Sequence, residues 1–419
     1  MTERTRVWWP NALSQVKTQA SPPAGFKSIS FVGSGNLSGL SCEMMEPHEL
    51  ASPADWLLLT SELEVWGDAP NPESITFVST SEGHRGLTAT LRNETEWVAE
   101  FLPWGSDGLF RRRCEAAAPI SNSPIGGYTH NGSDVIMMRM KSEGNQEQEA
   151  PLLSFLESGD LIRACEELYK RGALLGKYHK IVEEVRTTPP DPRRWNERLA
   201  SIEEGLRADS IWRAPHSRRT QCMLSLGDVR LTDLSKESVN IGRPRFADAL
   251  FKPNCEFPAI RDLAAVTHDL SRIHFDCKCQ LDIVELRSSL IDGWRSTAPG
   301  LWCSEQVFYT HRGGLAIWEY EQCLLDVIEA VSNQSGAPEP AVTLIGHVRA
   351  FQKRMFNNRT IGALSFMAAF FAATTLVTSP PSSLQEMVIP IAFFSSSYAL
   401  LRYYRSLSPG PEVPFTRFS

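Results

Sequence analysis

Four of the five aspartates within residues 221–270 restrict what this 419-residue chain can fold into more than any other feature of its sequence. Asp228 and Asp233 stand five residues apart, and Asp248 and Asp262 follow at longer intervals. Phosphoryl-transfer sites built on a loop, a short hairpin and a helix have this order of acids. One aspartate accepts the proton of the attacking hydroxyl, a residue about five positions later binds metal, and an aspartate after the hairpin holds the Mg²⁺ that bridges the phosphates. The spacing therefore predicts a phosphotransferase site in this stretch.

The same stretch resembles the catalytic core of the aminoglycoside-phosphotransferase-like branch of the protein-kinase-like superfamily. The catalytic loop of that family reads His-Gly-Asp-x-x-x-x-Asn. Residues 227–233 match it, with Leu226 in place of the histidine and Asp233 in place of the asparagine. Residues 245–248 match the metal loop, and residues 262–264 match the Asp-Leu-Ala that opens a buried helix. The order and spacing of these motifs carry the resemblance.

The resemblance implies a role for each aspartate. Asp228 is expected to be the catalytic base, and Asp233 and Asp248 are expected to bind Mg²⁺. Asp262 is expected to brace the catalytic loop. Only fourteen residues separate Asp248 from Asp262, whereas protein kinases need a longer segment there to cradle a peptide. A small molecule or a lipid head group, or no acceptor at all, fits this gap better.

Two alternatives stand beside this interpretation. Four acids can fall within fifty residues by chance in a chain of which 22% is charged. A shifted register places Gly242 at the metal position, and the site would then be inactive. We prefer Asp248 because residues 246–248 end an apolar-alternating run, where the motif belongs.

Residues 75–140 have the alternating apolar pattern of a β-rich lobe, which corresponds to the small lobe of the kinase-like fold. Strands are predicted over residues 75–78, 87–91, 96–102 and 135–140. A turn with Gly83 and Gly86 would lie over the nucleotide phosphates, because backbone N–H groups approach a phosphate closely where no Cβ intervenes. A simple hairpin explains the two glycines equally well. The adenine of ATP would dock near Met138, before a polar linker over residues 141–150.

The predicted strand over residues 96–102 departs from the family pattern. The family carries a lysine at its end, which grips the nucleotide phosphates and pairs with a glutamate on the next helix. Here the matching residue is Glu100, whereas the helical glutamate is present as Glu115. Because a carboxylate repels triphosphate, either an arginine of residues 111–113 supplies the missing charge or the site binds nucleotide poorly. The departure favours the alternative of a pseudokinase.

Helices are predicted for the rest of the body, over residues 152–180, 195–208, 262–275, 281–295 and 314–332. The first contains Leu-Gly-x-x-His at residues 175–179, which resembles the end of a large-lobe helix in the same family. We interpret His179 as a packed or capping residue rather than a catalyst.

Length and composition restrict the class of protein. The chain is long enough for two lobes that each have a core. A net charge of −7 argues against a general nucleic-acid binder. Nine cysteines in no regular framework indicate reduced thiols in a cytoplasmic setting. The N-terminus lacks the apolar core of a signal peptide.

The C-terminal region contains two apolar runs without ionisable side chains, residues 361–378 and 387–401. Each is near the length that a membrane-spanning helix needs, although the second is short. Basic residues flank the outer ends, so both ends are predicted to lie in the cytoplasm. A buried helical hairpin in a soluble core is the alternative, but basic flanks and a flexible linker over residues 333–340 favour a membrane.

Together these features predict an α+β, bilobal, protein-kinase-like fold with a C-terminal transmembrane helical hairpin. The expected order is an N-terminal extension of unknown role (1–70), a small lobe (71–140), a large lobe (141–331), a linker with a juxtamembrane helix (332–359), a membrane hairpin (360–405) and a tail (406–419). The expected function is transfer of the γ-phosphoryl of ATP, with Mg²⁺, to a hydroxyl of a small molecule or lipid head group, on the cytoplasmic side of a membrane. The alternative is a pseudokinase that acts as a membrane-bound scaffold or regulator with a protein partner.

Overall fold

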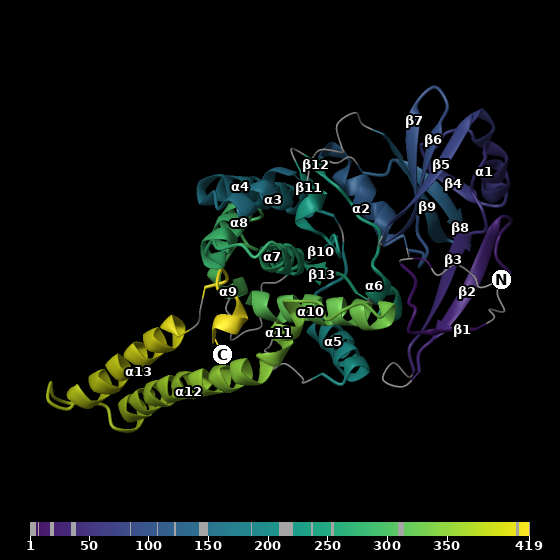
Figure 1. The fold of residues 1–419 in the computed structure, drawn as a ribbon. Coiled ribbons are helices and arrows are strands. Elements are labelled where there is room, and N and C mark those ends of the chain that lie inside the picture. Colours follow the sequence, from purple (N-terminus) through teal and green to yellow (C-terminus); the bar gives the residue numbers. More distant parts are fainter. Residues whose placement is uncertain are drawn as a thin grey trace.

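A body of two lobes and a projecting helical hairpin make up the protein in the computed structural model (Figure 1). The structure describes residues 6, 8–16, 21–34, 39–83, 85–106, 108–120, 123–141, 150–185, 187–208, 221–235, 238–252, 255–308, 314–407 and 410–418. Most of the predicted linker over residues 141–150 lies outside this part. The N-terminal lobe is rich in strands and the C-terminal lobe is helical.

A six-stranded antiparallel sheet forms the N-terminal lobe, with the strand order β4-β8-β9-β7-β6-β5. Its strands are β4 (Glu64–Gly67), β5 (Phe77–Gly83), β6 (Gly86–Arg92), β7 (Glu96–Phe101), β8 (Gly126–His130) and β9 (Ser133–Met140). The predicted strands over residues 87–91, 96–102 and 135–140 are confirmed, whereas β8 was not predicted because its sequence, Gly-Gly-Tyr-Thr-His, hardly alternates. Since β4 belongs to this sheet, the lobe begins before residue 71. Helix α1 (Pro53–Thr60) packs on the sheet through Trp56, which contacts Tyr128 of β8 edge to face.

The N-terminal extension forms a second, three-stranded sheet that connects the two lobes. Its strands are β1 (Ser14–Val16), β2 (Phe26–Val32) and β3 (Ser41–Pro47). Trp8 and Trp9 are buried in a cluster that also contains Trp104, after β7, and Phe246, on the helical lobe. The rings of Trp104 and Phe246 lie 4.8 Å apart. The extension is therefore part of the body.

The helical lobe is built around a closely packed pair of helices, α4 and α8, which run in the same direction. Its helices are α3 (Ala150–Ser158), α4 (Leu161–Val182), α5 (Pro192–Leu206), α6 (Phe246–Leu250), α7 (Ala259–Asp276), α8 (Ile283–Thr297), α9 (Glu305–Phe308) and α10 (Gly314–Asn333). The backbones of α4 and α8 approach closely because both present glycines at the contact: a Cβ at Gly172 would overlap the carbonyl of Leu290, and one at Gly293 the carbonyl of Tyr169. Helix α2 (Leu109–Ala117) joins the lobes, since its Phe110 belongs to the core cluster of the helical lobe.

Short elements between α5 and α7 carry the acids of the candidate site. Strand β10 (Cys222–Met223) pairs with β13 (Phe257–Pro258), and a small hairpin of β11 (Leu234–Ser235) and β12 (Ser238–Val239) follows the 3-10 turn η4 (Leu231–Asp233). Asp228 lies in the loop before η4, Asp248 lies on α6, and Asp262 lies in the first turn of α7.

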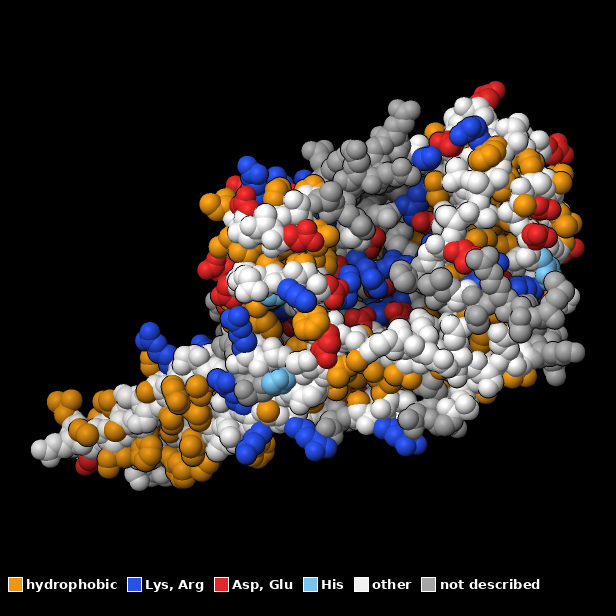
Figure 2. All heavy atoms as spheres, viewed as in Figure 1, with side chains coloured by type: hydrophobic (Ala, Val, Ile, Leu, Met, Phe, Trp, Pro, Cys, Tyr) orange, Lys and Arg blue, Asp and Glu red, His pale blue; other side chains and the backbone are white. Residues whose placement is uncertain are grey.

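Two antiparallel helices, α12 (Val348–Thr378) and α13 (Val388–Ser406), project from the helical lobe (Figure 1). They pack together, and the hydroxyl of Ser365 donates a hydrogen bond to the carbonyl of Ser397 at 2.8 Å. Their outer faces are apolar and exposed (Figure 2), as at Phe366, which is 72% exposed. Among the described helices, α12 alone is long and apolar enough to cross a membrane.

Part of the segment predicted as a linker and juxtamembrane helix (332–359) packs into the body. Helix α11 (Ala341–Gly346) and the first turns of α12 pack into the core of the helical lobe, where Val348, Phe351 and Met355 are buried. After α13 the chain returns to the body, where the Arg287 side chain donates hydrogen bonds to the carbonyls of Pro411 and Glu412. Both ends of the helical pair are thus held by the same lobe.

Candidate functional site

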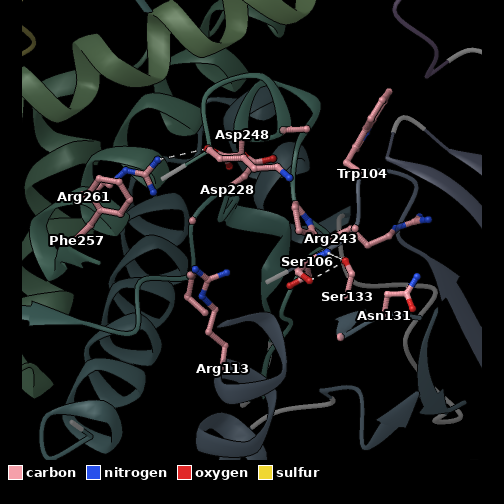
Figure 3. A pocket seen from close by; sticks show the side chains of 18 residues that line it. Trp104, Ser106, Arg113, Asn131, Ser133, Asp228, Arg243, Asp248, Phe257 and Arg261 are labelled. Carbon is pink, nitrogen blue, oxygen red and sulfur yellow. Dashed lines mark hydrogen bonds and ion pairs between the residues drawn. The ribbon is translucent and has the colours of Figure 1, made fainter. Parts of the chain in front are cut away.

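A cavity of about 270 Å³ opens between the two lobes and contains the predicted acids Asp228 and Asp248 in its wall (Figure 3). The strand-rich lobe contributes the loop after β7, the β8–β9 turn and α2. The helical lobe contributes the loop before η4, the segment between β12 and α6, and the beginning of α7. Basic side chains gather in the hollow between the lobes (Figure 2).

Hydrogen bonds to Asp262 hold the loop that carries Asp228. One carboxylate oxygen of Asp262 accepts the hydroxyl of Ser225 at 2.5 Å, and the other accepts the backbone N–H of Leu226 at 2.8 Å. Asp262 is fully buried at the start of α7, so the loop is fixed to the core of the lobe. The bracing role expected for Asp262 is confirmed.

His179 is also part of this support. It is fully buried on α4, its Nε2 lies 3.3 Å from Oδ2 of Asp262, and its Nδ1 accepts the indole N–H of Trp294 at 2.8 Å. With both ring nitrogens engaged and no exposed surface, the imidazole has no access to a ligand. Its interpretation as a packed residue is confirmed.

Three arginines surround Asp228, the predicted base. Nη2 of Arg85, in the turn between β5 and β6, lies 2.7 Å from Oδ2 of Asp228 and donates to its backbone carbonyl at 3.2 Å. Arg230 and Arg245 are each 3.9 Å from Oδ1. Burial alone would raise the pKa of Asp228, but these guanidinium groups outweigh it and hold the pKa well below its usual range. A carboxylate in this environment is a weak proton acceptor.

Gly242 lies on the opposite side of Arg85. It follows β12 by three residues, and a Cβ at this position would overlap the guanidinium of Arg85. The Arg85 side chain therefore fills the space between Asp228 and Gly242.

Asp248, a predicted metal ligand, is ion-paired with the helical lobe. Oδ1 of Asp248 lies 2.9 Å from Nη2 of Arg198 on α5 and 4.0 Å from Nη2 of Arg261 on α7. Both arginines also pair with Glu321 of α10. Asp248 thus belongs to a buried network of charges that connects the four helices α5, α6, α7 and α10.

Asp233, the other predicted metal ligand, is buried in η4 and does not line the cavity. Its Oδ2 accepts the backbone N–H of Arg230 at 2.8 Å, which closes the turn. Burial raises the pKa of this carboxyl to about 6. Within the part of the chain that the structure describes, no group of three or more histidine, cysteine or acidic side chains could hold a metal ion.

Glu100, at the position where the resembled family has a lysine, pairs with Arg139 on the neighbouring strand β9. Their carboxylate and guanidinium lie 2.6 Å apart. Burial would raise the pKa of Glu100, but Arg139, Arg243 and Arg85 together lower it. Glu100 therefore remains charged inside the lobe, and its partner Arg139 also bonds to Asn240 across the cleft.

The residues predicted to bind the nucleotide do not line the cavity. Gly83 and Gly86 pair with each other at the end of the β5–β6 hairpin. Met138 is fully buried in the core of the strand-rich lobe, and Glu115 is exposed on α2, without a contact to Glu100. The space beneath the hairpin holds Arg243, which donates hydrogen bonds to the carbonyls of Leu87 at 2.7 Å and Phe101 at 3.2 Å.

Several basic residues of the site were not predicted from the sequence: Arg85, Arg198, Arg243, Arg245 and Lys252. One signal was available in the sequence. Arg243 and Arg245 flank Pro244 just before Asp248, and Arg85 occupies the turn expected to contact phosphate. In the resembled family the residue that binds the phosphates is a lysine on a strand. Arginines in turns were therefore not considered as candidates.

No family model and no curated protein matches this sequence. Solved structures of similar fold include crystal form B of a glucosamine kinase, with a TM-score of 0.47 at 12% identity over 75% of this chain and 94% of that one. Crystal form A has a TM-score of 0.48 at 13% identity, over 73% and 89% of the two chains. The complex of glucosamine kinase with glucosamine, ADP and inorganic phosphate has a TM-score of 0.44 at 12% identity, over 75% and 94%. Likeness at this level assigns no activity.

Proposed function

We propose that this chain is a kinase-like, membrane-anchored regulator in which Arg85 takes the place of a divalent cation, so that transfer of phosphoryl groups from MgATP is impaired. The observation that carries the proposal is the guanidinium of Arg85 between Asp228 and Gly242. The hairpin of β11 and β12 leads directly to Gly242, in the shifted register of the metal motif. Glycine offers no carboxylate, and the neighbouring arginine supplies the positive charge.

The charges around Asp228 support the proposal. A bound Mg²⁺ would bring two positive charges close to Arg85, Arg230 and Arg245, which repel it. A catalytic base also needs a pKa near the working pH, whereas the pKa of Asp228 is lowered by the same arginines. Both effects oppose phosphoryl transfer in the arrangement described.

A second candidate function is the phosphotransferase itself, which would act on a hydroxyl of a small molecule or lipid head group. It is favoured because Asp228 and Asp248 line one cavity. Arg85 would have to leave Asp228 when MgATP binds. Asp228→Ala and Asp248→Asn would then each reduce transfer by about 100-fold or more.

A gain-of-function variant tests the first proposal. Arg85→Ala combined with Gly242→Asp removes the guanidinium and adds a carboxylate facing Asp228; the backbone of Gly242 is not in the left-handed region, so it accepts a side chain. We expect MgATP to leave the thermal stability of the wild type unchanged. The double variant should be stabilised by about 2.7 kcal/mol at a ligand concentration 100 times the dissociation constant. Arg92→Ala, which removes an exposed arginine from the same lobe, is the control.

The outcome also separates the two candidates. Mg²⁺-dependent stabilisation of the wild type by ATP, together with transfer that Asp228→Ala abolishes, would reject the cation role of Arg85 and establish the phosphotransferase.

The membrane part of the proposal rests on the hairpin. The apolar portion of α12 and the exposed apolar face that it shares with α13 have no covering element in the described chain. Both ends of the pair return to one lobe, so insertion from one side of a bilayer satisfies the geometry. Such insertion would bury the exposed side chains of both helices.

A further inference from the structure

We propose that the cavity between the lobes binds a small phosphate monoester through Arg113 and Lys252. This inference deepens the proposed function, since it names the ligand class of the same cleft. It differs from a nucleotide site because the residues expected to hold ATP lie outside this cavity and Arg243 fills the space beneath the β5–β6 hairpin.

Arg113 is the first part of the site. It is half-buried on α2 and extends into the cavity (Figure 3). Its neighbours on the helix are engaged, Arg111 with Asp134 at 2.7 Å and Arg112 with Glu256 at 3.4 Å. Arg113 has no ion-pair partner among the described residues, and its buried Nε has no hydrogen-bond acceptor. A partly buried guanidinium that faces a cavity without a partner indicates an anionic ligand.

Lys252 is the second part. It follows α6 on the helical lobe, lines the cavity, and has no ion-pair partner among the residues that the structure describes. The two acids of the cavity do not neutralise Lys252, because Asp228 is paired with Arg85 and Asp248 is paired with Arg198. The cavity therefore has an excess of positive charge.

The chemistry of the walls defines the class of ligand. Two unpaired cations on opposite lobes match a dianion, and the planar fork of an arginine matches two oxygens of a phosphate. Ser106, Asn131 and Ser133 add hydroxyl and amide groups on one wall, which suit a polar organic part. A volume of about 270 Å³ is at the lower end for ligand pockets, so the organic part is small.

Calorimetric titration of the full-length protein in phosphatidylcholine nanodiscs, without metal, tests the inference. Glycerol 1-phosphate and glycerol form a pair of probes that differ only by the phosphate. We expect the phosphate ester to bind and glycerol not to bind. Arg113→Met and Lys252→Met should each weaken binding by about 10-fold or more, as expected for loss of a charged hydrogen bond. Lys177→Met, which removes an exposed lysine of α4 far outside the cavity lining, should bind like the wild type.

Absence of glycerol 1-phosphate binding, or equal binding to wild type and both variants, would overturn the inference. Lys252 is exposed, so its replacement leaves the fold intact and the test does not depend on Arg113→Met alone. Nanodiscs that contain phosphatidic acid identify the source of the phosphate: competition with the soluble ester assigns the site to a lipid head group, and no competition assigns it to a soluble metabolite. Because no metal is added, the result does not depend on the cation role of Arg85, which MgATP tests separately.

Discussion

Arg85 and Asp228 belong to different lobes, so their ion pair also holds the cleft closed. Arg243 adds to this contact from the other direction, since it extends from the helical lobe to carbonyls of β6 and β7. Asn240 of the helical lobe also connects the lobes, because its side chain accepts a hydrogen bond from Arg139 of β9. In the described part of the chain, arginines thus connect the two lobes across the cleft.

Asp233 offers a test of charge burial at a single residue. Because burial raises its pKa to about 6 in the folded protein, above the value of 3.8 for an unperturbed carboxyl, the folded state is penalised as pH rises through this range. Asp233→Asn keeps an oxygen that can accept the Arg230 N–H. We expect it to raise the free energy of unfolding by roughly 2 kcal/mol at about pH 8 and to have little effect at about pH 4. Urea denaturation at both pH values measures this.

If Asp233 binds Mg²⁺, as the resemblance implied, then Asp233→Asn will lower stability in the presence of Mg²⁺ but not with a chelator.

At the scale of elements, the loop before η4 depends on α7 for its shape. Removal of the Asp262 carboxylate leaves the Ser225 hydroxyl and the Leu226 N–H without their buried acceptor. We expect Asp262→Ala to cost about 3–5 kcal/mol of stability, as for a broken buried charge interaction, and Asp262→Asn to cost less because an acceptor remains. Chemical denaturation compares the two, and equal stabilities of Asp262→Ala and the wild type would contradict the bracing role.

The three-stranded N-terminal sheet makes a further prediction. Trp9 is 1% exposed, and its indole packs edge to face on the ring of Phe31, with 6.2 Å between the ring centroids. Trp9→Ala should cost about 3–5 kcal/mol, as other large-to-small core substitutions do. Leu57→Ala, at a 44% exposed residue of α1, is the matched control and should change little. A stable Trp9→Ala variant would show that the sheet is dispensable to the body.

The sequence predicted elements better than it predicted their contacts. Alternation and helical spacing are local properties, so β6, β7, β9 and the helices α4, α5, α7, α8 and α10 could be located from them. The support of the loop by Asp262 was also accessible, through the family motif. The partners of Asp228 and Asp248 were not, because Arg85 and Arg198 come from distant segments and no local pattern relates them. For the same reason the packing of α11, which falls within the predicted linker and juxtamembrane helix (332–359), was not predicted, since its contact with the core depends on tertiary contacts.

At the scale of the whole molecule, the hairpin can be separated from the body only at the right positions. Ending the chain near Pro340 would remove α11 and expose the core that Val348 and Phe351 fill. We therefore expect that variant to aggregate. Replacing residues 360–405 with a short Gly/Ser linker keeps both α11 and the returning tail, and should give a soluble body. The full chain should partition with membranes and resist carbonate extraction, as fractionation and immunoblotting would show.

A full-length protein that is soluble and monomeric without detergent would contradict the membrane anchor. The exposed apolar side chains of α12 and α13 would then need another cover, such as a second copy of the hairpin.

Helix α12 begins inside the body and continues for 31 residues without a break. Its first turns are fixed by Phe351 and Met355 in the core, while Phe366 and Phe370 are exposed further along the same helix. In an anchor of this kind, no flexible hinge separates the body from the membrane. The opening of the cleft would stay at a fixed distance from the bilayer and in a fixed orientation relative to it. Partners embedded in the same membrane would reach it by diffusion in two dimensions and would meet it in a single orientation.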